Sequence, residues 1–143
     1  MKITKTKLKG VFIFQTKQFK DPRGWFSESY NKKTFKAVTT TSFVQDNVSF
    51  NKKKYTFRGL HFQTKPFQQS KLIRVEQGAI LDVVLDLRVK SKTYLKMITV
   101  KLDDQNQKQL FIPKGLAHGF LTLTTNTKVF YKVDQFYSPK HDQ

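Results

Sequence analysis

The feature that most limits the fold of this chain is an alternation of apolar and polar residues with a period of two. It is clearest in residues 95–102 and 128–134. Successive side chains of a strand point to opposite faces, so each segment predicts a strand with one packed face. The packed positions expected from this alternation are Ile98, Val100 and Leu102 in the first segment, and Val129, Tyr131 and Val133 in the second.

A longer segment, residues 71–88, carries two apolar runs that are broken at Gln77-Gly78. This pattern predicts a hairpin. Its second arm, residues 79–87, is apolar on both faces except at Asp82 and Asp86. Such a strand is typical of one that is buried on both sides.

Turn residues recur along the chain, at 21–24, 103–106, 113–115 and 125–126. Helical periodicity is almost absent, and residues 32–38 are expected to form one or two turns at most. Many short strands with frequent turns favour a sandwich or a jelly-roll barrel. With 143 residues and no linker or repeat, the chain is expected to form one domain, residues 1–143.

The residue types exclude several classes of protein. There is no cysteine, which rules out disulfides and thiolate metal sites. No apolar run approaches the roughly 18 residues that a membrane span needs, and the N-terminus has no signal-peptide pattern. We therefore expect a cytoplasmic protein without membrane contact.

The formal net charge of +17 raises the question of an anionic partner such as nucleic acid. Lysine supplies 23 of the 27 cationic residues (27 − 4 arginines), and these lysines are scattered along the chain. Arginine reads guanine edges better than lysine, and it is scarce here. The charge therefore indicates a general lysine bias rather than a nucleic-acid surface.

Polar residues inside apolar strands point to the candidate site, because burial of a polar group costs free energy unless it is paired or used. Residues 57–63 read Phe-Arg-Gly-Leu-His-Phe-Gln, and His61 and Gln63 are expected to share one strand face. Each polar residue could instead be structural: a hydrogen-bonded core histidine, an Asp82 paired with Lys71 or Arg74, or a core Tyr131. Together they are hard to explain by packing alone: His61, Lys71, Asp82, His118 and Tyr131.

A metal site is not expected. Barrels of this kind often hold a metal through His-x-His, a downstream Glu and a third His, but Gln63 follows His61-Phe62 and no Glu comes before Glu76. Two histidines without a clustered carboxylate make a poor metal site. The Pro-x-Gly-x-x-His spacing is present at Pro113, Gly115 and His118, but the other ligands of such a metal site are missing.

Five motifs, in order and spanning essentially the whole chain, closely resemble the dTDP-4-dehydrorhamnose 3,5-epimerase family. They are residues 21–28 (Asp-Pro-Arg-Gly-Trp-Phe-Ser-Glu), 43–47 (Phe-Val-Gln-Asp-Asn), 58–63, 71–74 (Lys-Leu-Ile-Arg) and 111–120. The resemblance implies an all-β cupin jelly-roll barrel with strand exchange in a homodimer. It also implies a cofactor-independent isomerase that inverts C3 and C5 of a dTDP-4-keto-6-deoxyhexose.

The resemblance further assigns roles to residues. Removal of a proton next to a ketone needs a placed base and a group that stabilises the enolate. His61 would be the base, Tyr131 the proton donor on the opposite face, and Lys71 the cation at the enolate, with His118 and Asp82 shaping the pocket. The remaining residues implied in substrate binding are Arg23 and Arg58 at the diphosphate, and Phe26, Glu28, Gln45, Asn47, Gln63 and Tyr137 nearby. The segment from Arg23 to Glu28 would reach the pocket of the other subunit.

One departure concerns the C-terminal end of the sequence, where Gln143 comes soon after Tyr137-Ser138-Pro139. Family members continue beyond this point, and their tail supplies an aspartate that orients the catalytic histidine. Loss of an orienting carboxylate can cost orders of magnitude in rate. Asp134 or Asp142 could take its place.

Three hypotheses follow. The first is the nucleotide-sugar epimerase, acting on C3, C5 or both, and the second is a binding relative impaired in catalysis or acting on another nucleotide 4-keto sugar. The third, a basic nucleic-acid-binding barrel, predicts salt-sensitive binding but leaves the polar strand residues without a role.

Overall fold

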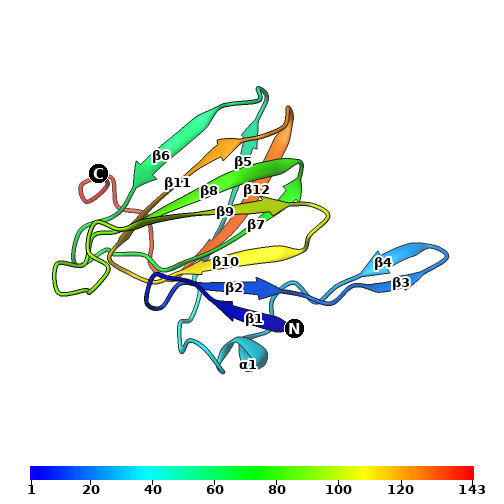
Figure 1. The fold of residues 1–143 in the computed structure, drawn as a ribbon, viewed down its shortest axis with the longest axis horizontal. Coiled ribbons are helices and arrows are strands. Elements are labelled where there is room, and N and C mark those ends of the chain that lie inside the picture. The colour runs from blue at the N-terminus through cyan, green and yellow to red at the C-terminus, as the bar shows by residue number, and fades with distance from the viewer.

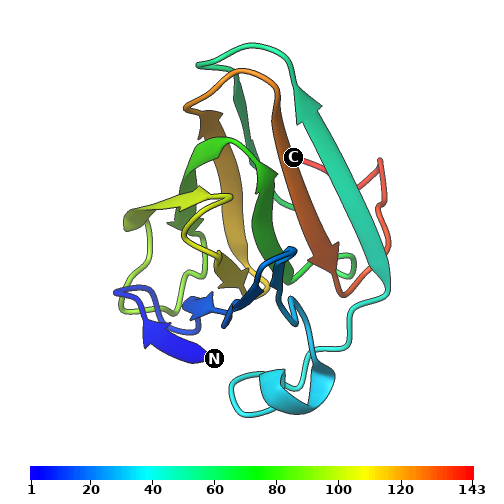
Figure 2. The same ribbon diagram turned by 90° about the vertical axis from the view of Figure 1, so that its right-hand side faces the viewer.

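The structure is a computed structural model that describes residues 1–143, and all but one of its regular elements are strands. Two antiparallel sheets form its body (Figures 1 and 2). The six-stranded sheet has the order β1 (Lys2–Lys5), β2 (Phe12–Gln15), β10 (Lys108–Ile112), β7 (Lys71–Gln77), β12 (Thr127–Val133), β5 (Gln45–Asn51). The four-stranded sheet has the order β6 (Phe57–His61), β11 (Leu116–Thr122), β8 (Ala79–Asp86), β9 (Met97–Asp103).

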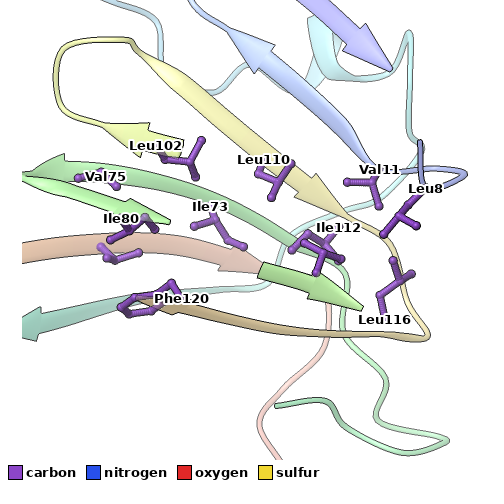
Figure 3. Packing of buried hydrophobic residues seen from close by; sticks show 12 residues of the cluster. Leu8, Val11, Ile73, Val75, Ile80, Leu102, Leu110, Ile112, Leu116 and Phe120 are labelled. Carbon is purple, nitrogen blue, oxygen red and sulfur yellow. The ribbon is translucent and has the colours of Figure 1, made fainter. Parts of the chain in front are cut away.

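Both sheets contribute to one hydrophobic core, as expected for two layers packed face to face. Its twelve buried side chains are contributed by both sheets and by the loop that joins β1 to β2 (Figure 3). The alternation in β9 is confirmed, since Leu102 is buried and Met97, Thr99 and Lys101 are exposed. In β12 the two valines, 129 and 133, are buried, and the half-buried Tyr131 lies between them.

The hairpin predicted for residues 71–88 is wrong in one respect. Both arms are strands and the chain turns at Gly78, but β7 pairs with β10 and β12 whereas β8 pairs with β11 and β9. The two arms therefore lie in different sheets. The physical reason is that both are apolar enough to be central strands, and each layer needs a central strand facing the shared core.

A two-stranded hairpin, β3 (Phe19–Asp21) and β4 (Gly24–Phe26), projects from the body (Figure 1). All its residues are exposed. The exposed fractions of its aromatic side chains are 55% for Phe19, 56% for Trp25 and 70% for Phe26. Large aromatic side chains on a protruding element indicate a surface that is covered by another molecule.

The single helix, α1 (Lys32–Phe35), begins after Asn31, whose side chain accepts a hydrogen bond from the backbone N–H of Lys33 at 2.9 Å. Phe35 is buried in a second cluster with Phe14, Leu72 and Phe111, which fixes the helix below the six-stranded sheet. The short helical segment expected for residues 32–38 is thus confirmed. No helix in the structure has the length and apolar character needed to cross a membrane.

Candidate active site

A cavity of about 560 Å³ is lined by residues of both sheets and by loops. It contains eight of the residues predicted for the site. From the six-stranded sheet come Gln45, Asn47, Lys71 and Tyr131, from the four-stranded sheet Arg58, His61 and His118, and from the C-terminal loop Tyr137.

Strand pairing places the four cavity residues of the six-stranded sheet on one face of that sheet. Lys71 lies opposite Val133 on β12, and Tyr131 is two positions from Val133. Asn47 lies opposite Tyr131 on β5, and Gln45 lies opposite Val133. Because directly paired residues and alternate residues share a face, all four polar side chains point the same way.

Strand β5 has an inverted pattern of polarity. Gln45, Asn47 and Ser49 are partly covered, whereas Val48 and Phe50 on the opposite face are 60% and 48% exposed. In an ordinary edge strand the apolar side chains face the core. Here the inward side is polar because it lines a cavity, and the apolar side is exposed, with Val48 and Phe50 also bordering the cavity.

Lys71 lies at a position where burial destabilises the charged form of its side chain. Burial lowers the pKa of its ammonium group, while the negative charges of Asp82 and Asp142 oppose that shift. Burial likewise raises the pKa of the Tyr131 phenol, with Arg58 acting in the opposite direction and Asp142 adding to the rise. The cavity thus combines a cation in a water-poor position with a phenol that stays protonated at neutral pH.

His118 is held by a buried carboxylate. Its Nε2 lies 2.9 Å from Oδ2 of Asp82, and the Asp82 side chain is fully buried. Burial raises the pKa of Asp82, against the effects of His118 and Lys71. Asp82 does not line the cavity; it stands behind His118, and its Oδ1 has no hydrogen-bond partner.

Arg58 is held by a residue that the sequence reasoning missed. Its Nε donates to Oδ1 of Asn51 at 2.6 Å, and Asn51 Nδ2 donates to the carbonyl of Thr127 at 3.2 Å. Asn51 continues the polar alternation of Gln45, Asn47 and Ser49 along β5. That alternation in the sequence could have indicated Asn51 as a further polar residue on the cavity side of β5.

Gln63 is not brought into the cavity. Strand β6 ends at His61, and the buried Gln63 donates to the carbonyls of Phe67 at 2.7 Å and Phe136 at 3.2 Å. Its Oε1 accepts from the backbone N–H of Ser138 at 2.6 Å. Of the two residues expected to share a strand face, only His61 lines the cavity, and Gln63 fixes the C-terminal loop instead.

The two carboxylates considered as orienting groups for His61 have different surroundings. Asp134 accepts from the backbone N–H of Ser70 at 2.6 Å and lies outside the cavity. Asp142 lines the cavity, and its Oδ2 accepts from the Tyr137 hydroxyl at 3.1 Å. Asp142 is thus a cavity residue that binds Tyr137 rather than His61.

The hairpin residues do not reach the cavity of their own chain. Arg23 and Phe26 are exposed on the projecting hairpin and Glu28 follows it. The Arg23 side chain forms an ion pair with Asp21 of the same hairpin, at 2.6 Å. No group of three or more His, Cys, Asp or Glu side chains is placed to hold a metal ion.

Comparison with known proteins decides the family. The family model of dTDP-4-dehydrorhamnose 3,5-epimerase matches residues 5–143. The chain belongs to this family. It is an isomerase of the dTDP-4-dehydrorhamnose 3,5-epimerase type, as the sequence motifs led us to expect.

Individual members of the dTDP-4-dehydrorhamnose 3,5-epimerase family agree closely with the chain. The enzyme of Sinorhizobium fredii is 46% identical over 134 residues, which is 93% of this chain and 69% of that protein. The crystal structure of the Bacillus anthracis enzyme with TDP and PPi bound has a TM-score of 0.97 and 48% identity, covering 99% of this chain and 82% of that one. The predicted cupin-type barrel is thereby confirmed.

A relative with a narrower activity has the same fold. The 3'-monoepimerase of Streptomyces bikiniensis, solved in complex with dTDP-quinovose, has a TM-score of 0.90 and 26% identity. It covers 96% of this chain, and this chain covers 70% of it. The fold alone therefore does not determine how many carbons are inverted.

Proposed function

We propose that the chain inverts both C3 and C5 of a dTDP-4-keto-6-deoxyhexose without a cofactor, in the synthesis of a rhamnose-type deoxysugar. One observation carries this proposal. His61 and Tyr131 reach one cavity from different sheets, and Lys71 lines the same cavity beside Tyr131. A base, an acid and a cation arranged around one space are what proton transfer next to a ketone requires.

The proposed chemistry starts at a carbon next to the C4 ketone. His61 removes the proton from one face of the sugar, and the electrons move to the C4 oxygen to give an enolate. The Lys71 ammonium stabilises that oxygen, because a cation in a water-poor site interacts strongly with developing negative charge. Tyr131 then returns a proton to the same carbon from the opposite face, which inverts the centre.

His118 and Asp82 complete the sugar pocket. The Asp82 contact fixes the orientation of the His118 ring at the cavity wall, so His118 presents its other nitrogen, Nδ1, to a sugar hydroxyl or to the C4 oxygen. A buried carboxylate behind a histidine commonly sets ring orientation and tautomer.

The nucleotide is assigned to the mouth of the cavity. Arg58, held by Asn51, faces the diphosphate, for which the guanidinium group is well suited. Gln45, Asn47 and Tyr137 lie near the thymidine and neighbouring groups. We place Arg23, Phe26 and Glu28 of a second copy at the same nucleotide, because these residues lie outside the cavity of their own chain.

A homodimer follows from this assignment. Two exposed apolar surfaces support it: the aromatic side chains of the projecting hairpin and the outward face of β5 with Val44, Val48 and Phe50. Symmetric exchange of the hairpins would cover both surfaces.

Complementation between two inactive variants tests the hairpin exchange. His61→Ala removes the base, and Arg23→Ala removes the nucleotide contact given to the other copy. When the two variants are refolded together, half of the dimers are mixed, and one of their two sites has both residues intact. We expect recovery of about a quarter of wild-type turnover. Activity no higher than the sum of the separate variants would contradict exchange of the hairpin.

The pH dependence of kcat/KM should identify Lys71. The ammonium form is required, and burial lowers its pKa below the ordinary 10.5, whereas the pKa of Tyr131 is raised above 10.0. Activity should therefore fall at alkaline pH as Lys71 loses its proton, at a lower pH than an ordinary lysine would. In Lys71→Arg the guanidinium stays charged, so the alkaline fall should move to higher pH. Lys65→Arg, at an exposed position outside the cavity, should leave the profile unchanged.

Proton NMR of dTDP-4-keto-6-deoxyglucose in deuterated water tests the proposed reaction itself. Disappearance of the C3 and C5 signals with formation of the inverted sugar is the expected result. Loss at C3 alone would make the chain a mono-epimerase, the second candidate, like the Streptomyces bikiniensis relative. Binding of dTDP without exchange at either carbon would show an impaired relative or a different keto sugar, and would overturn the proposal.

A further inference from the structure

Strands β6 and β11 are out of step beside the cavity. His61 pairs with His118 and Arg58 pairs with Phe120, so three steps along β6 lie opposite two steps along β11. Gly59 and Leu60 of β6 therefore face the single residue Gly119 of β11. Two residues opposite one define a β-bulge, which bends a strand and changes the direction of its side chains.

The bulge resolves a conflict between strand geometry and the site. In a regular strand, residues three apart point to opposite faces. Arg58 and His61 are three apart, yet both line the cavity. One additional residue between them turns His61 back to the face of Arg58.

Two glycines allow the backbones to meet at this point. A Cβ atom on Gly119 would lie 2.6 Å from the Arg58 carbonyl oxygen and 3.2 Å from Gly59 Cα. A Cβ atom on Gly59 would lie 2.6 Å from Gly119 Cα and 2.8 Å from the His118 carbonyl oxygen. Gly59 also has a φ of +119°, which side-chain-bearing residues rarely adopt. The nearest obstructing atom at each glycine is backbone, so a methyl group must separate the strands.

We propose that Gly59 and Gly119 are positioning residues of the epimerase site: their glycine-to-glycine contact seats the bulge that places Arg58 and His61 on the same face. The inference depends on the proposed function for its chemistry, in which Arg58 holds the diphosphate and His61 removes the proton. Neither glycine touches the reacting atoms in this scheme. They act through the two residues on β6.

Gly119→Ala is the direct test, and Gly78→Ala is the matched control. Gly78 lies at the turn between β7 and β8, outside the cavity. A Cβ atom on Gly78 would collide with Oγ1 of Thr124. Both variants should unfold at lower temperature. Only Gly119→Ala should weaken dTDP binding about tenfold, through displaced Arg58, and slow proton exchange about a hundredfold, through misplaced His61.

Combined variants separate positioning from general damage. If Gly119 acts through His61, adding Gly119→Ala to His61→Ala should slow exchange no further, and adding it to Arg58→Ala should weaken dTDP binding no further. A Gly119→Ala protein that loses stability but binds dTDP and exchanges protons at wild-type rates per folded molecule would overturn the inference.

The position of His61 can also be monitored by NMR without a substrate. The chain has three histidines, at 61, 118 and 141. Gly119→Ala should move the ring NMR signals of His61 and His118 and leave that of His141 in place, whereas Gly78→Ala should move none of them. A wild-type chain that neither binds dTDP nor exchanges protons would defeat the proposed function only. Unmoved His61 and His118 signals in folded Gly119→Ala would defeat the positioning inference by itself.

Discussion

His61→Ala is expected to slow solvent exchange at both C3 and C5 of dTDP-4-keto-6-deoxyglucose about a thousandfold, the usual range for loss of a placed general base. His61 lies at the end of β6, lines the cavity and is not part of the hydrophobic core. Binding of dTDP should therefore stay close to that of the wild type. Proton NMR in deuterated water and calorimetric titration with dTDP measure the two effects.

His141→Ala is the control for this experiment. His141 stacks on Phe67, with 4.5 Å between the ring centroids, and lies outside the cavity. It should keep both binding and exchange. Rapid exchange at either carbon in His61→Ala would assign the base at that carbon to another residue, and His118 would be the first candidate.

Tyr131→Phe is expected to uncouple exchange from inversion. His61 can still remove the proton and return a deuteron from the same face, so the C3 and C5 signals should disappear. Delivery to the opposite face is lost with the hydroxyl, and formation of the inverted sugar should slow by about a hundredfold or more. Deuterium incorporation with retained configuration is thus the expected signature, and NMR coupling constants distinguish the two configurations.

Tyr30→Phe is the matched control for Tyr131→Phe, because it also removes a phenol hydroxyl. Tyr30 is also half-buried, packs against Phe35 with ring centroids 5.1 Å apart, and has its pKa raised by burial. It lies outside the cavity, so exchange and inversion should both persist. Full inversion by Tyr131→Phe would show that the second proton comes from elsewhere, with Tyr137 or water as the source.

Local pattern was sufficient for the parts of the fold that depend on single strands. The alternation in residues 97–103 and 127–133 predicts which side chains pack in the core. It can do so because the two-residue period of a strand is set by its own backbone. The separation of β7 and β8 into different sheets could not be read in this way. It depends on pairing with β10, β11 and β12, which lie far along the chain.

The site shows the same division. Eight residues of the predicted site line the cavity. Polar positions inside apolar strands already indicated His61, Lys71, His118 and Tyr131, whereas Gln45, Asn47 and Tyr137 came from the motif resemblance alone. Gln63 was misplaced because its direction depends on where β6 ends and on the carbonyls of Phe67 and Phe136. The common face of Arg58 and His61 was equally hidden, since a bulge requires knowledge of the opposite strand.

The outward apolar face of β5 and the aromatic hairpin belong to a molecule with a formal net charge of +17. Two such copies would repel one another as they approach, while the surfaces that would join them in the proposed dimer are apolar. Dissolved ions shorten the reach of that repulsion to about 8 Å at physiological ionic strength and leave apolar contacts intact. Pairing of the copies should therefore tighten as salt is added, opposite to the behaviour of a basic protein on nucleic acid. At low ionic strength and high dilution, each cavity would then lack the nucleotide contacts that we propose for Arg23, Phe26 and Glu28 of a second copy.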